Sequence, residues 1–467
     1  MTTSSLSADA IPARQPARYA LAVPVGARAR LATGWLWLAL LALLGSGLFS
    51  ILLVLARAPL TQDLFATADF FRVALVVHVD LSVLVWFSAF AGLLWTLSAG
   101  ERAIRVGRAG LAACAAGTLA LCVAPFVGRE APVMSNYVPV LDGPVFLGGL
   151  VLFAAGAGLL VGRTMFAARR VGTRPDGNAA LVFGTNAAAI SAAVALLAFA
   201  WSYAALPRSL DGKAYYEVLF WGGGHVLQFT WTLLMFTAWL ALADASGARV
   251  PLTPRVAILL FAIGLAAVFA TPVIYLAYDI TSVEHYRLQT WLMRIGGGLA
   301  IVPFSAAMLY ALATAPRAQG EERPLRAALG WSLALFGAGG VIGFLIDGSN
   351  VKIPAHYHGA IVGVTLAFMG LTYHLLPRLG LARPAPRLAA LQPWLYGAGQ
   401  LAHITGLVWS GGYGVQRKVA GAAQALQSAE QVAAMGLMGF GGLAAVAGGF
   451  VFVLIVLRSA WTCSGSR

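Results

Sequence analysis

Charged residues are scarce in this chain of 467 residues. Asp, Glu, Lys and Arg together make up 10% of it, whereas 60% of it is apolar. A soluble chain of this length would divide into domains with charged surfaces, so the composition excludes a soluble globular protein. The chain must be embedded in lipid.

Cysteines are also scarce. The three cysteines, Cys114, Cys122 and Cys463, form neither a CxxC motif nor a paired spacing. This scarcity argues against a disulfide framework and against a thiolate metal site.

Long apolar runs are abundant instead, and they recur at the length of about 20 residues that spans a bilayer. An alternating strand pattern is absent, and lipid forces each backbone group to find a partner within its own segment. We therefore predict an all-α integral membrane bundle of twelve transmembrane helices. The predicted spans lie near residues 33–56, 73–98, 107–127, 144–168, 179–205, 214–243, 254–278, 295–315, 325–346, 354–377, 391–412 and 430–457.

The connections between these spans are short, which predicts a single membrane domain over residues 33–457 with tails at 1–32 and 458–467. Of the 31 Lys and Arg residues, 21 fall in the tails and in the loops on the same side as the tails. The positive-inside rule then predicts that both tails are cytoplasmic. This bias and the attraction to anionic lipid account for the net charge of +14, so nucleic-acid binding is not expected.

Histidines are few, and most of them share one depth. Five of the seven lie in the outer half of the predicted bundle, on four different helices. An ionisable side chain inside a span is costly, which makes it a functional candidate, although an interhelical hydrogen bond explains any single one equally well. The five are His78, His225, His285, His356 and His358.

The segment Ala355–Gly359 holds two of these histidines, His356 and His358, two residues apart. On a helix such side chains point in nearly opposite directions, so one metal could not bind both. Two cofactors flanking one helix would use this spacing, and His78 is available as a second axial ligand for one of them. Haem suits such neutral imidazole ligands in an apolar bundle.

Through these residues the sequence resembles catalytic subunit I of the haem-copper oxygen reductases and their relatives, the nitric oxide reductases. The resemblance covers essentially the whole chain and implies two haems. His78 and His358 would be the axial ligands of a low-spin haem, and His356 would bind a high-spin haem. His225, which follows three glycines after Trp221, would bind a non-haem metal, either copper or iron. The glycines would admit a cofactor or allow tight helix packing.

The family carries a histidine pair where this chain reads Val283-Glu284-His285-Tyr286. His285 then fits one metal ligand, and Glu284 occupies the position of the other. Two histidines and a carboxylate suit ferrous iron, whereas copper favours nitrogen or sulfur, so this substitution points weakly toward iron. The alternative is that Glu284 is a solvated loop acid.

Oxygen reduction in this superfamily uses a tyrosine near the second metal. The usual position, one turn after the histidine that corresponds to His225, holds Phe229 here, but Tyr278 lies shortly before Glu284, as in the C-type oxidases. Tyr278 is therefore a candidate catalytic residue, or else an interfacial aromatic residue like Tyr275.

Family glutamates that carry protons are also missing after His225, where Leu227 and Phe229 stand instead. Proton uptake from the outer side through Asp279, Glu284 or Glu217 is a hypothesis.

In the last outer loop, Arg417 and Lys418 resemble the basic pair that neutralises haem propionates, the alternative being ordinary hydrated loop charges. The two remaining histidines receive no ligand role. His374 lies near the cytoplasmic end of its helix, far from the other histidines, and His403 is interpreted as a packing residue.

The resemblance predicts the catalytic subunit of a respiratory terminal oxidase of the bacterial inner membrane, which reduces O2 to water. A nitric oxide reductase with iron as the second metal is the alternative. A transporter or haem-handling protein without redox catalysis is the alternative of another class, and it would leave the placed histidines unexplained. Nothing outside the spans is large enough to form a cupredoxin or cytochrome c domain, so we expect an electron-donating partner subunit that carries one.

Overall fold

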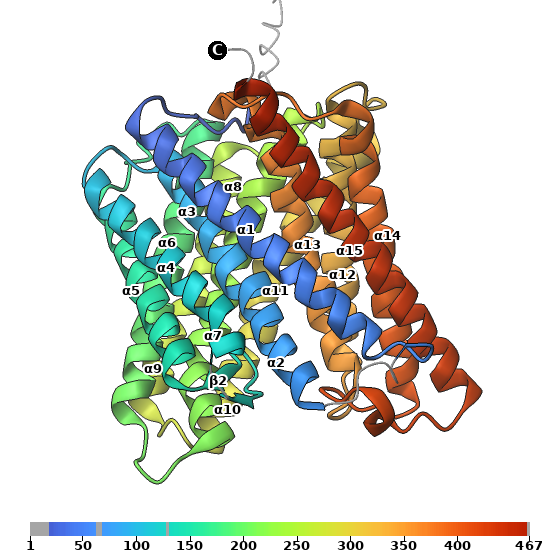
Figure 1. The fold of residues 1–467 in the computed structure, drawn as a ribbon. Helices are drawn as coiled ribbons and strands as arrows, with labels where there is room; N and C mark the ends of the chain where they lie inside the picture. The colour runs from blue at the N-terminus through green and yellow to red at the C-terminus, as the bar shows by residue number, and fades with distance from the viewer. Residues whose placement is uncertain (1–17, 62–67, 128–129, 465–467) are drawn as a thin grey trace, which may run out of the picture.

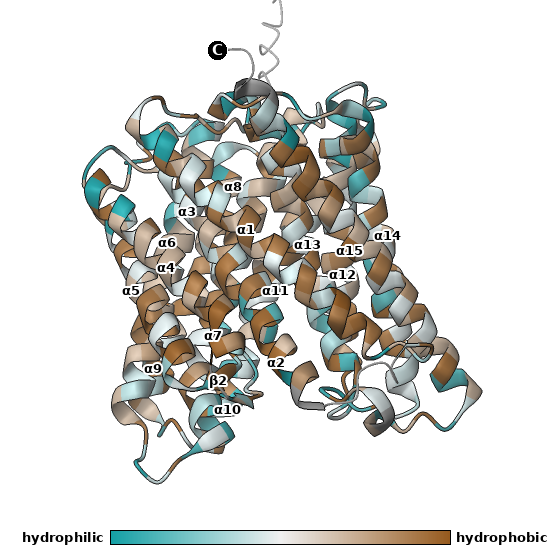
Figure 2. Cartoon of the chain, in the orientation of Figure 1, coloured by the Kyte–Doolittle hydropathy of each residue, from teal (hydrophilic) through white to brown (hydrophobic). Residues whose placement is uncertain are grey.

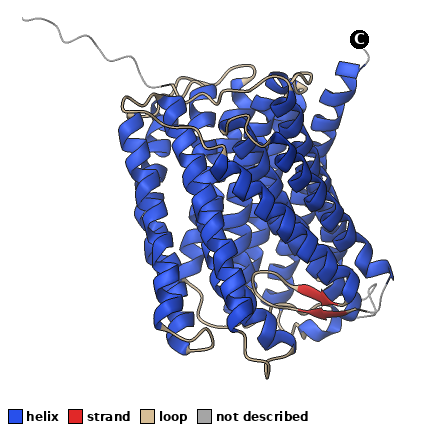
Figure 3. Ribbon diagram, turned by 90° about the vertical axis from the view of Figure 1, so that its left-hand side faces the viewer, coloured by secondary structure: helices blue, strands red, loops and turns tan. Residues whose placement is uncertain are grey.

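The computed structural model describes residues 18–61, 68–127 and 130–464 of the chain. It is a bundle of long helices with one small hairpin at one end (Figures 1 and 3). In the hairpin, β1 (Ala131–Val133) pairs antiparallel with β2 (Val140–Asp142). We call this end of the bundle the hairpin side. It corresponds to the outer side that the loop charges predict.

The helices run along the whole described chain, and three of the spans are built from consecutive helical pieces. The helices are α1 (Ala27–Leu55), α2 (Ala68–Val79), η2 (Asp80–Val85), α3 (Trp86–Ser98), α4 (Ile104–Val127), α5 (Pro144–Phe166), α6 (Gly177–Ala205), α7 (Gly212–Ala245), α8 (Pro254–Ala266), η3 (Ala267–Phe269), α9 (Ala270–Ala277), α10 (Val283–Trp291), η4 (Leu292–Gly296), α11 (Gly297–Thr314), α12 (Glu322–Phe344), α13 (Lys352–Leu375), η5 (Pro377–Leu379), α14 (Pro386–Gly412), η6 (Gly421–Gln424) and α15 (Ala429–Ser464).

Among the described residues, 11 helical segments are long and apolar enough to cross a membrane. Apolar residues cover the middle of the bundle, and polar residues gather toward its ends (Figure 2). The prediction of an all-α integral membrane protein is therefore confirmed. The count of twelve is not, because α14 is 27 residues long but is not among the 11. Its buried Gln392, Gln400 and His403 reduce its hydropathy.

The helical region reaches further in both directions than the predicted membrane domain. α1 begins at Ala27 and α15 continues to Ser464, while residues 1–17 and 465–467 of the predicted tails lie outside the described residues. Both described ends of the chain lie opposite the hairpin side (Figure 1).

Local sequence signals explain several helix starts. Proline, whose missing N–H costs nothing in the first turn, begins α5, α8 and α14. The Asp176 side chain caps α6 by accepting a hydrogen bond from the Ala179 N–H at 2.7 Å. Ser282 caps α10 in the same way, accepting from the His285 N–H at 3.2 Å.

Glycines let α12 and α13 pack backbone against backbone. A Cβ added at Gly339 would lie 2.4 Å from the backbone N of Ala360, and one added at Gly359 would lie 2.5 Å from the Cα of Gly339. In a membrane, where helices gain little from the hydrophobic effect, such close contact is a main source of helix association. The same contact brings the carbonyl of Gly339 to His356.

We predict that Gly339→Ala lowers the free energy of unfolding by about 1–3 kcal/mol, because the added methyl group overpacks a backbone contact. Gly340→Ala is the matched control: a Cβ there meets no described atom within 4 Å, and alanine favours helix over glycine by about 1 kcal/mol. Denaturant titration of the two variants in detergent measures both effects. Equal stability of the two variants would contradict the packing argument.

Candidate cofactor and metal sites

His78 lies near the end of α2 and is oriented by α1. Its Nδ1 is 3.0 Å from the backbone O of Ser46 and 3.0 Å from the hydroxyl of the same serine. A backbone carbonyl can only accept, so Nδ1 donates to it and Nε2 keeps the lone pair that a metal requires. Ligating histidines almost always donate their second N–H in this way. The side chain therefore fits the predicted haem ligand.

His356 and His358 lie on different sides of α13, as their spacing predicts. The Nδ1 of His356 donates to the O of Gly339 on α12 at 2.7 Å, which again leaves Nε2 free. The ring of His358 lies on the side of α14, where its centroid is 4.9 Å from that of His403. His78 lies close enough to His358 for charges on the two imidazoles to interact. The structure thus brings the predicted axial ligands, His78 and His358, into one region.

A cavity of about 100 Å³ lies beside His356, between α7, α13, η2 and the start of α3. Its lining includes Tyr137, Gln228 and Tyr357. This volume suits a small gas molecule. A porphyrin would require the lining side chains to move apart, since pockets for larger ligands occupy about 300–1,000 Å³.

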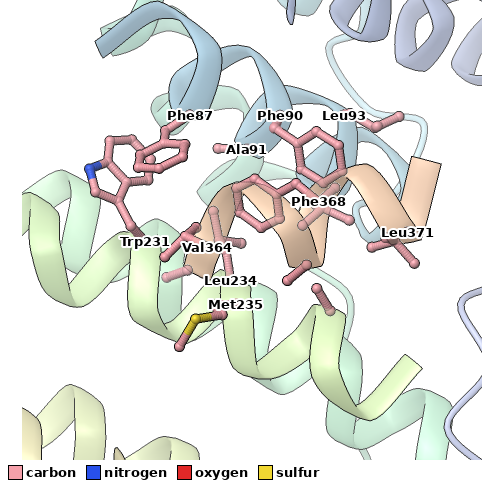
Figure 4. Packing of buried hydrophobic residues seen from close by; sticks show 14 of the residues in the cluster. Phe87, Phe90, Ala91, Leu93, Trp231, Leu234, Met235, Val364, Phe368 and Leu371 are labelled. Carbon is pink, nitrogen blue, oxygen red and sulfur yellow. The ribbon is translucent and has the colours of Figure 1, made fainter. Parts of the chain in front are cut away.

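Aromatic side chains pack beside this cavity. Phe87 and Trp231 line it, and their ring centroids are 5.5 Å apart. Next to them, Phe90 stacks on Phe368 with centroids 4.1 Å apart and ring planes at 7° (Figure 4). This apolar layer joins α3, α7 and α13, so aromatic packing holds together the helices around the cavity.

His225 lies on α7 with its Nδ1 donating to the O of Trp221 at 2.8 Å. The three preceding glycines are explained by packing, because a Cβ at Gly222, Gly223 or Gly224 would lie 2.2–2.4 Å from an aromatic side chain. One of these aromatic residues, Tyr137, has its ring centroid 4.8 Å from that of His225.

His285 and Glu284 are separated by the geometry of α10. His285 is 2% exposed and within electrostatic range of His225, whereas Glu284 is exposed to solvent. Within the described residues, no three His, Cys, Asp or Glu side chains come close enough together to hold a metal ion. The structure therefore brings two of the three predicted ligands of the second metal together, and it does not bring Glu284 to them. This pair of imidazoles is an incomplete ligand set.

The exposure of Tyr278 fits its interfacial interpretation, whereas the burial of Tyr275 does not. Tyr278 follows the last residue of α9 and is 40% exposed. Tyr275 is buried, with its ring centroid 4.7 Å from that of His285 and its hydroxyl 2.7 Å from the hydroxyl of Ser202. The tyrosines beside the two histidines are thus Tyr275 and Tyr137.

Sequence reasoning also missed two buried polar residues. Asp80 begins the π-helical segment η2 two residues after His78, is 1% exposed, and has no hydrogen-bond partner among the described residues for either carboxylate oxygen. Gln289, one turn after His285, is fully buried, and its amide is likewise unpaired within the described chain. Asp80 could have been found from the sequence, because an ionisable residue inside a span is a functional candidate. Gln289 carries no such signal.

Arg417 and Lys418 lie on the hairpin side, close to the cavity. Arg417 donates to the hydroxyl of Tyr357 at 3.4 Å, and Tyr357 lines the cavity. Lys418 donates to the O of Met134 at 2.7 Å and lines a second, more open pocket of about 350 Å³ with Arg72 and Lys213. Burial, together with the nearby positive charge of Arg417, lowers the pKa of Lys418 to about 8. This concentration of positive charge suits carboxylates such as haem propionates.

The chain is similar to known proteins in sequence and in fold. The chain matches the family model described as cytochrome c and quinol oxidase polypeptide I over residues 30–445. An uncharacterized protein of Rickettsia prowazekii (strain Madrid E) is 28% identical, and the match covers 94% of this chain and 97% of that protein. An uncharacterized protein of Aquifex aeolicus (strain VF5) is 29% identical over 74% of this chain and 84% of its own length. A heme-copper terminal oxidase dimer solved by cryo-EM shares the fold, with a TM-score of 0.71, 17% identity and coverage of 94% of this chain and 84% of that one.

The lowered pKa of Lys418 generates a prediction about haem binding. The chain has three lysines, Lys213, Lys352 and Lys418, so acetylation of each can be followed by mass spectrometry. In haem-depleted protein the acetylation rate of Lys418 should be half-maximal near pH 8, because the reactive neutral amine forms above its pKa. In haem-loaded protein the midpoint should rise, since a propionate stabilises the ammonium form. Lys352, paired with Asp347 at 2.9 Å, is the control. Identical Lys418 profiles in the two preparations would contradict a propionate contact.

Proposed function

Because the chain belongs to the cytochrome c and quinol oxidase polypeptide I family, whose members are membrane-bound oxidoreductases, we propose that it is the catalytic subunit of a respiratory haem-copper-type terminal oxidase that reduces O2 to water. The observation that carries the proposal is the placement of His356 and His358 on opposite sides of α13. One faces a cavity of gas-molecule size, and the other faces the region of His78. The membrane is proposed to be the bacterial inner membrane, with cytoplasmic termini.

The residues divide into roles. His78 and His358 would hold a low-spin haem, His356 a high-spin haem, and Arg417 and Lys418 the propionates. When bound, the haems would supply electron transfer and gas binding. The non-haem metal, copper or iron, is proposed on His225 and His285, with Glu284 as a further ligand only if α10 turns.

Electrons are proposed to arrive on the hairpin side from a partner subunit with a cupredoxin or cytochrome c domain. The cationic pocket of Arg72, Lys213 and Lys418 lies on this side. Protons for the reduction, four per O2, are proposed to enter from the same side.

Glu217 is the acid best placed to deliver those protons. Its carboxylate accepts hydrogen bonds from the backbone N of Asn136, at 3.1 Å, and from the side-chain amide of that residue. Asn136 in turn accepts from Arg417 at 3.3 Å, and Arg417 reaches Tyr357 at the cavity. Of the three hypothesised acids, Glu217 alone has such a described connection to the cavity. Glu284 is exposed, and the Asp279 carboxylate accepts a hydrogen bond from the backbone N–H of Thr281.

Nitric oxide is the second candidate substrate. Joining two NO molecules needs two electrons and two protons and does not require a tyrosine. The observation that favours it is the 40% exposure of Tyr278. This exposure does not fit the catalytic role that the oxygen reaction assigns to Tyr278. A transporter or haem-handling protein is the alternative of another class.

Haem extraction with metal analysis tests the proposal. Purified protein should contain two haems, one low-spin and one high-spin. His78→Ala should lose the low-spin spectrum and keep the high-spin one, and His356→Ala should do the reverse, because each removes an axial ligand. His374→Ala is the control. One copper per two haems favours oxygen as substrate, one iron beyond the two haem irons favours nitric oxide, and protein without haem would refute the proposal.

Replacement of Glu217 tests the proton entry. Glu217→Gln should lower turnover by about 10²-fold or more, the typical contribution of a positioned acid or base, while both haem spectra stay unchanged. Asp211→Asn, which changes an exposed acid at the start of α7 on the same side of the bundle, should keep nearly full turnover. Full activity of Glu217→Gln would exclude Glu217 as the proton donor.

A further inference from the structure

His403 lies on α14 and is 8% exposed. Its ring centroid is 4.9 Å from that of His358, with the ring planes at 67°. Interpreted from the sequence as a packing residue, it instead touches a proposed haem ligand. The inference below rests on the proposed low-spin haem at His78 and His358.

The hydrogen bond that His403 makes determines which of its nitrogens is free. Its Nδ1 lies 2.9 Å from the backbone O of Met438 on α15. The carbonyl can only accept, so Nδ1 carries the proton and Nε2 keeps an unshared lone pair. Among the described residues, Nε2 has no hydrogen-bond donor of its own. His403 is therefore a buried acceptor beside His358.

Close packing of α14 on α15 holds this ring in place. A Cβ at Gly441 would lie 2.3 Å from the backbone N of His403, and one at Gly406 would lie 2.5 Å from the backbone N of Met438. Only glycine fits at such separations. The carbonyl of Met438 is thus fixed against the imidazole by the backbones themselves, so the tautomer is set by the fold.

His358 lacks the contact that its counterparts have. The Nδ1–H of His78 donates to the backbone O of Ser46, and the Nδ1–H of His356 donates to the backbone O of Gly339. Within the described part of the chain, no group hydrogen-bonds the ring of His358. A neutral imidazole that binds iron through one nitrogen keeps a proton on the other, and that N–H needs an acceptor.

We propose that His403 is a positioning residue for the low-spin haem: its Nε2 accepts the ring N–H that His358 keeps when its other nitrogen binds the iron. The Met438 carbonyl, His403 and His358 then form a chain of hydrogen bonds. An acceptor on that N–H increases the electron donation of His358 to the iron. It stabilises the ferric form and lowers the midpoint potential of this haem.

Three variants in the full protein test the chain of hydrogen bonds. His403→Phe keeps a ring and removes the acceptor, His403→Gln keeps an acceptor of similar reach, and His403→Asn has an acceptor that is too short to reach. The control is His374→Phe. His374 lies 16 residues after His358 on α13, or about 24 Å along the helix. The readouts are a spectroelectrochemical titration of the low-spin haem and its low-spin electron paramagnetic resonance signal.

In His403→Phe, the ratio of reduced to oxidised low-spin haem at the wild-type midpoint should rise about tenfold, the lower end of typical effects of such partners. This corresponds to a shift of about 59 mV for one electron. The resonance signal should shift as well. His403→Gln should stay near wild type, and His374→Phe should not differ from it.

A wild-type potential and signal in His403→Phe would overturn the inference. If that variant does not assemble, equal potentials in His403→Gln and His403→Asn would overturn it instead. Wild-type protein without a low-spin haem would refute the proposed function itself, which is a different result from a haem that does not respond to His403.

Discussion

The hydrogen bond from a histidine N–H to a backbone carbonyl is the interaction on which the site depends. A buried imidazole without a partner would cost about 1–3 kcal/mol in unmet hydrogen bonding, and lipid offers none. Donation from Nδ1 to a carbonyl removes this cost and leaves Nε2 as a fixed, unprotonated acceptor. Four imidazoles share this arrangement: His78, His225, His356 and His403. Each is oriented for ligation or for accepting a proton by the fold alone.

The source of these carbonyls links the site to helix packing. His225 uses a carbonyl four residues back on its own helix, where the second lone pair of the oxygen is free. The other three use a neighbouring helix, which requires two helices to approach closely. At Gly339 and Gly441 a single added Cβ would prevent that approach. The abundance of glycine is thus a requirement of the site as well as of bundle association.

The spans and the depth of the histidines could be predicted because lipid imposes one length and one backbone solution on every segment. Which side of each helix faces the interior of the bundle could not be predicted. Glu284 and His285 are adjacent in sequence, yet about 100° separates them on α10, so one is exposed and the other buried. Tyr278 lies outside the buried region because α9 ends at Ala277 and its backbone becomes extended.

His403 was missed for a related reason. A histidine in the middle of α14 has no near neighbour in sequence that suggests a ligand, and its partners come from α13 and α15. Its contact with His358 exists only once three helices have packed. The three glycines before His225 were ambiguous between cofactor approach and packing, and aromatic rings beside all three decide for packing.

The two ends of the candidate site differ in how far the fold prepares them. At α13, the Nδ1 of His356 is hydrogen-bonded and its neighbours are packed. Orienting this side chain therefore adds little free-energy cost to the binding of a ligand. At α10, the Nδ1 of His285 and the amide of Gln289 are buried and unpaired among the described residues. Each such group costs about 1–3 kcal/mol, so any molecule that pairs with them stabilises the folded chain by a comparable amount. The α10 end is therefore the part of the bundle whose stability should depend most strongly on what it binds.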